Sequence, residues 1–327
     1  MIKNNKILKI LLSSLGLLLF VVAIVYLIIW NNDNKLYGKL AFSDTYNRGE
    51  LIDKIVLQST EETVVLLQKN NYWLLENKNN YYADFTMVHK FLNSFNNSIY
   101  SVRIPYNKEL ADEKYLNNPE NYEKNSGILI RTYIKDELVD EMIVGLPAED
   151  KNYYFARNFK DNNIWLISGN FDLPLYAKDW ILRPLFAVLT KKIESITIDG
   201  ETITTENEFT PFYNKKGEVV KVDLLSKVLS GIYVVDALDK EKFSKILAQN
   251  KDIKNKKMNV VTSYGLIVDF DIYYNDKQLW SNIKLSTSSL PLSVINDYIK
   301  DSNFLYDGWY FEISPEQGHI LRYFNFM

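Results

Sequence analysis

Short runs of apolar, β-favouring residues, separated by polar turn residues, recur along the chain beyond residue 50. The first three runs, at residues 52–57, 63–67 and 72–75, are rich in β-branched and aromatic side chains and are separated by polar turn residues. Short β-rich runs with polar connections are typical of antiparallel strands joined by turns. The N-terminal part of the body is therefore predicted to be a β-meander.

The period then changes to that of a helix. Large apolar residues at positions 88, 91, 92 and 95 follow Asp84, a suitable N-cap residue, so the sequence predicts an amphipathic helix over 85–96. Further strands are predicted at 99–104, 128–133, 138–144, 153–156 and 164–167, with a Lys135-Asp136 turn between the second and the third of them. These elements make up a first module, residues 51–190.

From residue 191 onward the order of elements echoes the first module. A strand at 193–198 meets an Asp199-Gly200 turn and a returning strand at 201–205, the strongest short hairpin signal in the chain. A helix over 224–229 follows, and Gly231 is expected to end it in the left-handed region. Later matches pair 232–235 with 99–102, 265–268 with 127–130, and Trp309 with Trp165. The preserved order predicts an internal duplication, with a second module at residues 191–327.

The expected fold class is α+β: two tandem, related modules, each a mainly antiparallel sheet with a packed helix, behind one N-terminal transmembrane helix. Residues 10–30 carry no charge and would span roughly 31 Å as a helix, which matches a bilayer core. Lysines precede the run at positions 3, 6 and 9, and its end, Leu27-Ile28-Ile29-Trp30, lacks the small residues of a cleavage site.

These features predict a single-pass protein of the inner (cytoplasmic) membrane. Residues 1–9 would be cytoplasmic, residues 10–30 an uncleaved anchor in the lipid bilayer, residues 31–50 a tether, and the C-terminal body would be periplasmic or otherwise extracytoplasmic.

Composition narrows the possible partners of this body. Without the three N-terminal lysines, the chain has 35 cationic and 41 acidic side chains. The resulting net charge of −6 disfavours binding to nucleic acid. The chain has no cysteine, which excludes disulfides and thiolate metal sites, and its 47% hydrophobic residues indicate a sizeable core. No glycine-rich phosphate-binding motif is present, so no nucleotide is expected.

Two groupings of reactive side chains can be interpreted as an active site or as ordinary structure. Asp269 and Asp271 lie two residues apart, and paired carboxylates can act as acid and base or hold calcium. Alternation of this kind is also how a half-buried strand presents its solvated face, which is the interpretation we favour. Ser281 and Lys284 fit the Ser-x-x-Lys pattern, but its usual partner motifs are missing.

The remaining candidates are weaker still. His89 and His319 are isolated, so neither a metal site nor a catalytic relay is predicted, and no cofactor is expected. The basic run at 251–257 could bind an anionic surface, but a solvated loop or a helix end is the favoured interpretation.

A stretch that contains one tryptophan, a proline and several other large apolar residues lies between the modules. Pro184 cannot continue a preceding helix, so a break is expected there. The stretch is interpreted as a module junction, or alternatively as a docking patch for another protein, formed by Trp180, Arg183, Pro184, Leu185 and Phe186.

Several of these motifs together resemble an uncharacterised family, domain of unknown function 4340. The likeness covers about 50–325 and rests on the single anchor, the Ile-x-x-Ile-x-Leu opening strand, Tyr72-Trp73, Ala83-Asp84, the Tyr-Tyr-Phe-Ala-Arg run at 153–157 and Trp-Ile-Leu-Arg-Pro-Leu-Phe at 180–186. The resemblance implies an accessory component associated with gliding-motility-type ABC transport systems. It implies no catalytic residues.

The expected function is that of a membrane-anchored, non-catalytic accessory or scaffold subunit, not an enzyme. Its partner would be an integral membrane transport complex of the ABC type, by resemblance. Two alternatives stay open: an envelope module that binds glycan or another ligand, and a hydrolase whose site is dispersed in the sequence.

Overall fold

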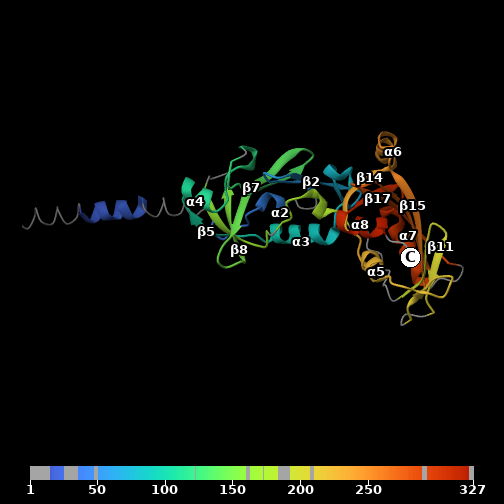
Figure 1. Cartoon of the computed structure of the whole chain (residues 1–327). Helices are drawn as coiled ribbons and strands as arrows, with labels where there is room; N and C mark the ends of the chain where they lie inside the picture. Colours follow the sequence, from blue (N-terminus) through green and yellow to red (C-terminus); the bar gives the residue numbers. More distant parts are fainter. Residues whose placement is uncertain are drawn as a thin grey trace, which may run out of the picture. The chain divides into compact units, whose positions relative to one another are not determined.

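The computed structural model describes residues 15–25, 36–47, 51–121, 123–159, 163–171, 173–182, 192–206, 210–288 and 293–323 (Figure 1). Most of the body consists of two nine-stranded antiparallel sheets with helices packed against them. The predicted α+β class is therefore confirmed.

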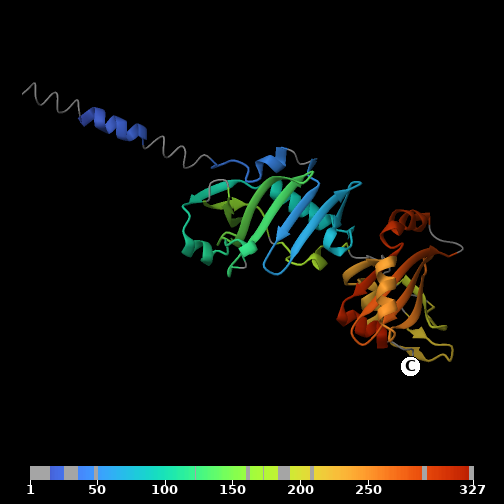
Figure 2. The ribbon, with the colours of Figure 1, turned by 90° about the horizontal axis from the view of Figure 1, so that it is seen from above.

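The first sheet is formed by strands that lie between residues 54 and 168. Its spatial order is β4-β3-β2-β1-β6-β7-β8-β9-β5, and Figure 2 shows its blue and green strands side by side. The strands are β1 (Lys54–Gln58), β2 (Thr63–Lys69), β3 (Tyr72–Leu75), β4 (Tyr81–Tyr82), β5 (Tyr100–Ile104), β6 (Ile128–Ile134), β7 (Glu137–Pro147), β8 (Tyr153–Asn158) and β9 (Ile164–Ser168).

The second sheet has the same spatial order as the first. It runs β13-β12-β11-β10-β15-β16-β17-β18-β14, so β10 takes the place of β1, β15 that of β6 and β14 that of β5. The strands are β10 (Ile193–Ile198), β11 (Glu201–Thr204), β12 (Phe212–Tyr213), β13 (Val219–Val220), β14 (Val234–Asp239), β15 (Lys254–Thr262), β16 (Leu266–Tyr274), β17 (Leu279–Thr287) and β18 (Trp309–Ile313).

In each sheet, the strand at the end of the spatial order is preceded in the chain by a helix. Helix α3 (Phe85–Asn96) precedes β5, and its Asp84 cap accepts a hydrogen bond from the Met87 amide at 3.1 Å, as predicted. Helix α5 (Asp223–Ser230) occupies the corresponding place before β14. The other helices are α2 (Ser43–Asn47), α4 (Lys108–Glu113), α6 (Lys240–Gln249), α7 (Ser293–Ser302) and α8 (Pro315–Tyr323), with 3₁₀ turns η2 (Glu76–Lys78), η3 (Pro119–Asn121), η4 (Ala177–Trp180) and η6 (Asn303–Leu305).

Two local predictions were wrong. Gly231 follows α5 with φ −172°, which is extended backbone, because the chain passes directly from the helix toward β14 instead of reversing through a left-handed cap. The basic run was expected in a loop or helix end, but Lys254 to Lys257 form the start of β15, where they pair with β16. Lys256 is 5% exposed, so this lysine belongs to the packed face of the strand.

Part of the N-terminal segment is also described. Residues 15–25 are helical, and their side chains are exposed. The rest of the predicted span at 10–30 lies outside the described residues. In the ranges given above, no helix has both the length and the apolarity needed to cross a membrane.

Residues 36–47, within the predicted tether, pack on the first sheet. The Gly38 amide donates to the Tyr100 carbonyl at 2.8 Å, and Phe42 is buried, with its ring stacked 3.5 Å from that of Phe95. Helix α2 is then fixed by a buried polar cluster: Asp140 accepts hydrogen bonds from the Thr45 amide at 2.8 Å and from the Thr45 hydroxyl at 2.9 Å. We call this cluster the α2 clasp.

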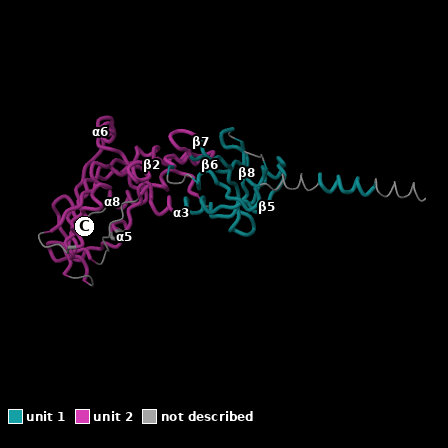
Figure 3. Tube along the Cα trace, turned by 180° about the vertical axis from the view of Figure 1, so that it is seen from behind, with its two compact units in different colours: residues 1–51, 91–132, 138–172 teal, residues 52–90, 133–137, 173–327 magenta. Residues whose placement is uncertain are grey.

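The chain forms two compact units (Figure 3). One comprises residues 1–51, 91–132 and 138–172, and the other residues 52–90, 133–137 and 173–327. Strands β1–β4 thus belong to the same unit as the second sheet. Within that unit the buried Tyr81 ring lies 4.9 Å from Trp309 and 5.3 Å from Phe311, and its hydroxyl donates to the Leu305 carbonyl at 3.2 Å.

Candidate functional site

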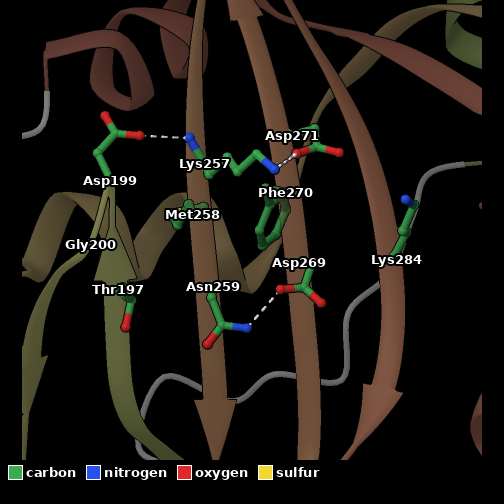
Figure 4. Close-up of a pocket in the computed structure, with 10 residues that line it drawn as sticks. All are labelled: Thr197, Asp199, Gly200, Lys257, Met258, Asn259, Asp269, Phe270, Asp271 and Lys284. Atoms are coloured by element: carbon green, nitrogen blue, oxygen red, sulfur yellow. Dashed lines mark hydrogen bonds and ion pairs between the residues drawn. The ribbon is translucent and has the colours of Figure 1, made fainter.

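A polar hollow lies on the second sheet, over the middle of β10, β15, β16 and β17. Its volume is about 310 Å³. Figure 4 shows side chains from neighbouring strands and from the turn after β10 side by side there. The lining residues include Thr197, Asp199, Lys257, Asn259, Asp269, Asp271 and Lys284.

The alternation of each strand creates this polar face. In β16 the side chains of Val268, Phe270 and Ile272 are buried, whereas Asp269 and Asp271 point to the opposite face. This is the arrangement expected of a half-buried strand.

Neighbouring strands supply partners for most of these groups. The Asn259 amide donates to Asp269 at 2.7 Å, and the Lys257 ammonium lies 3.9 Å from Asp271. Asp199 accepts a hydrogen bond from the Lys257 backbone amide at 2.8 Å. Such cross-strand pairs stabilise a sheet by about 0.2–1 kcal/mol each. Lys284 faces Asp269 in the register, although no ion pair joins them among the described residues.

The hollow can therefore exchange hydrogen bonds with a polar ligand. Its geometry does not give Asp269 and Asp271 the distinct roles of a catalytic acid and a catalytic base. The two aspartates have different partners, Asn259 for Asp269 and Lys257 for Asp271. The described part of the chain contains no group of three or more His, Asp or Glu side chains placed to hold a metal ion.

Of the other predicted candidates, Lys284 lines this hollow, whereas Ser281, His89 and His319 do not. Ser281 is buried and donates to the Asn282 carbonyl at 3.3 Å, whereas Lys284 is exposed, because residues three apart on a strand point to opposite faces. His89 and His319 are exposed on α3 and α8.

The structure describes one of the five residues of the interpreted junction or docking patch. Trp180 is completely buried in η4, and its indole N–H donates to the Pro174 carbonyl at 3.0 Å. Its backbone carbonyl accepts a hydrogen bond from the Asp84 amide at 2.7 Å. Arg183, Pro184, Leu185 and Phe186 lie outside the described residues.

A second cluster of charged groups was missed by sequence reasoning. Asp236 on β14 and Glu312 on β18 are directly opposite in the register, and the Lys78 ammonium lies 3.7 Å from Asp236. Burial raises the pKa of Asp236 above its ordinary value, an effect that Lys78 partly offsets. Burial also raises the pKa of Glu312, which accepts a hydrogen bond from Gln278 at 3.0 Å.

Only the pairing of β14 with β18 reveals this cluster. The residues are separated by more than 70 positions and carry no motif, so no signal in the sequence could have identified them. Two neighbouring carboxylates at a partly buried site, one of them ion-paired with a lysine, form a pH-sensitive contact.

Comparison with known proteins gave one match. A family model described as "Domain of unknown function (DUF4340)" matches residues 73–254, more than half of the chain. No curated protein and no solved structure matches the chain. The resemblance drawn from the sequence motifs is thus confirmed at the level of the family.

Proposed function

The chain belongs to the DUF4340 family, and from this premise we propose that it is a non-catalytic accessory subunit of a membrane transport complex, anchored in the cytoplasmic membrane. The anchor is the apolar run at residues 10–30, and the two-sheet body lies outside the cytoplasm. The ABC type of the transport complex is part of this proposal and rests on the resemblance alone.

The observation that carries the proposal is the exposed apolar helix at residues 15–25. Leu17 exposes 66% of its surface, Phe20 63% and Val22 57%. Burying one side chain of this kind stabilises a structure by roughly 1.5–3 kcal/mol, so a helix that is apolar all round requires a bilayer or a partner to cover it. The lysines before the run favour the orientation with the body outside.

The two sheets support a scaffold role in a second way. Their identical strand order agrees with an internal duplication, which we propose as the origin of the body. Two modules in tandem provide a large surface on which other subunits can dock. Most of the charged groups on the open face of the second sheet are held in cross-strand pairs, as on a solvated surface.

Anchor replacement tests this proposal. In one strain residues 1–30 are replaced by a cleavable signal peptide that releases the body, and in another by an unrelated single-span anchor of the same orientation. Confinement to a membrane raises the effective concentration of a partner in that membrane to roughly the millimolar range. We expect the released form to lose the function measured by complementation of a deletion strain, and the replaced anchor to restore it.

Full complementation by the released body would refute the accessory-subunit proposal. The same strains test for catalysis, because a general acid or base contributes about 10²–10⁴-fold in rate. We expect Asp269→Asn and Asp271→Asn, made singly, to complement within about twofold of the wild type. A loss of function of about 10²–10⁴-fold in either variant, with normal protein levels, would favour a hydrolase.

The polar hollow favours a second candidate, a module that binds an envelope glycan or another polar ligand. Hydroxyl groups could donate to Asp269 and accept from Lys284. Titration of the full chain in detergent with soluble cell-wall glycan fragments tests this candidate. Binding that is lost in Lys284→Met and retained in the exposed control Lys277→Met would support it, and absence of binding would exclude it for the fragments used.

A further inference from the structure

A group of large apolar side chains is exposed along one edge of the first sheet. Strand β5 is the last strand in that sheet's order. The group, which we call the β5 fringe, has members with 37–65% of their surface exposed: Tyr37, Ile99, Val102, Tyr106 and Phe159. All of them belong to the same compact unit.

Contacts join these residues into one surface. The backbone at residues 38–40 pairs with that at 99–100, which places Tyr37 beside the start of β5. At the other end of the strand, the Arg157 guanidinium lies 4.7 Å from the centre of the Tyr106 ring and 5.7 Å from that of Phe159. The fringe therefore has the Tyr37 ring at one end and the Tyr106 and Phe159 rings at the other, where both contact the Arg157 guanidinium.

The chain leaves the described body at this same edge. Residues 26–37 connect the helix at 15–25 to Gly38, the first residue whose amide is bonded to β5. Twelve residues span no more than roughly 43 Å when fully extended. The predicted tether, residues 31–50, would have allowed a greater distance, but the packing of residues 36–47 on the sheet removes most of that length.

We propose that the β5 fringe rests on the headgroup region of the membrane that holds the anchor, an inference that depends on the proposed membrane anchor. Tyrosine and phenylalanine place an apolar ring and, for tyrosine, a polar tip at a membrane surface. Arg157 can bind a lipid phosphate while its stem and the two rings cover apolar surface. Contact with the bilayer would remove the exposed apolar area and fix which side of the body faces the membrane.

The absence of cysteine in the natural sequence makes this testable in the full chain. Val102→Cys places a single thiol in the fringe, and Leu138→Cys is a matched control, because Leu138 lies in the same unit and exposes 52% of its surface against 47% for Val102. Each variant is labelled with an environment-sensitive fluorophore and reconstituted in vesicles that contain phosphatidylglycerol and lipids spin-labelled near the headgroup.

We expect the label at position 102 to be quenched at least twofold more than the label at 138, and to shift to shorter wavelength. Tyr37→Cys gives an independent fringe position with the same expectation. Equal quenching at 102, 37 and 138 would overturn the inference. Flotation of the same samples separates the two proposals: protein that fails to float with vesicles refutes the anchor, whereas protein that floats without differential quenching refutes the fringe contact alone.

Discussion

Removing the carboxylate of the α2 clasp is expected to loosen α2 from the first sheet. Asp140 is 3% exposed and accepts two hydrogen bonds from Thr45, one from its amide and one from its hydroxyl. The Thr45 hydroxyl also lies 2.7 Å from that of Thr132. The clasp therefore joins α2 to the neighbouring strands β6 and β7.

The size of the effect follows from these contacts. A hydrogen bond to a charged group is worth roughly 1.5–3 kcal/mol, and Asp140→Ala removes two while leaving a buried amide without its acceptor. We expect a loss of about 3–5 kcal/mol in the free energy of unfolding of this unit. Thr45→Val removes only the hydroxyl and should cost about 1–2 kcal/mol. The double variant should cost less than the sum, since the two residues share one interaction.

Thermal unfolding of the full chain measures the global effect, and hydrogen exchange of the Thr45 amide measures the local one. The expected loss corresponds to a fall of roughly 6–20 °C in the midpoint, with faster exchange at Thr45. Asp140→Asn is the control of equal size and retains one acceptor oxygen. If Asp140→Ala stays within about 1 kcal/mol of the wild type and the Thr45 amide remains protected, the clasp does not hold the segment.

Three further variants and one pH series test other contacts. Gly145→Ala should destabilise the protein by about 1–3 kcal/mol in urea unfolding, because the added carbon would lie 2.1 Å from the Lys114 carbonyl oxygen. Gly231→Ala, with open space around its Cβ position, should be neutral or stabilising by up to about 1 kcal/mol, and a larger loss would contradict the extended backbone there. The raised pKa values of Asp236 and Glu312 mean that the folded state holds their protons more tightly than the unfolded state. The two carboxyl groups contribute fully to stability when the pH is below their ordinary pKa values, 3.8 for Asp236 and 4.5 for Glu312. This contribution is lost as the pH rises through the raised pKa values of the folded state. Relative to Glu312→Gln, the wild type should therefore lose stability as pH rises above 4.5, the ordinary value for Glu312, and parallel pH curves would contradict this.

Local patterns predicted many elements within one or two residues. Helix α3 and strands β3 and β10 have the predicted bounds, since their apolar residues recur at a clear period and their ends carry strong signals. The Asp199-Gly200 turn has positive φ at both residues, as its type requires. Such elements are specified by neighbouring residues alone.

Elements specified by distant contacts escaped prediction. Helix α6 buries Phe243, whose ring stacks 4.0 Å from Tyr310, but six of its ten residues are charged or polar and its period is weak. The two-residue strands β4, β12 and β13 are too short to show any period. The carboxylate pair at Asp236 and Glu312 depends on the register of β14 and β18, which no local pattern encodes.

The insertion of Tyr81 among residues near the C-terminus has a consequence for biosynthesis. A polypeptide emerges from the ribosome, or from an export channel, with its N-terminal part first, and domains generally fold in that order. Tyr81 packs on Trp309 and Phe311, which emerge more than 200 residues later. The hairpins that contain Tyr81 must therefore wait, with aromatic surface exposed, until synthesis is almost complete.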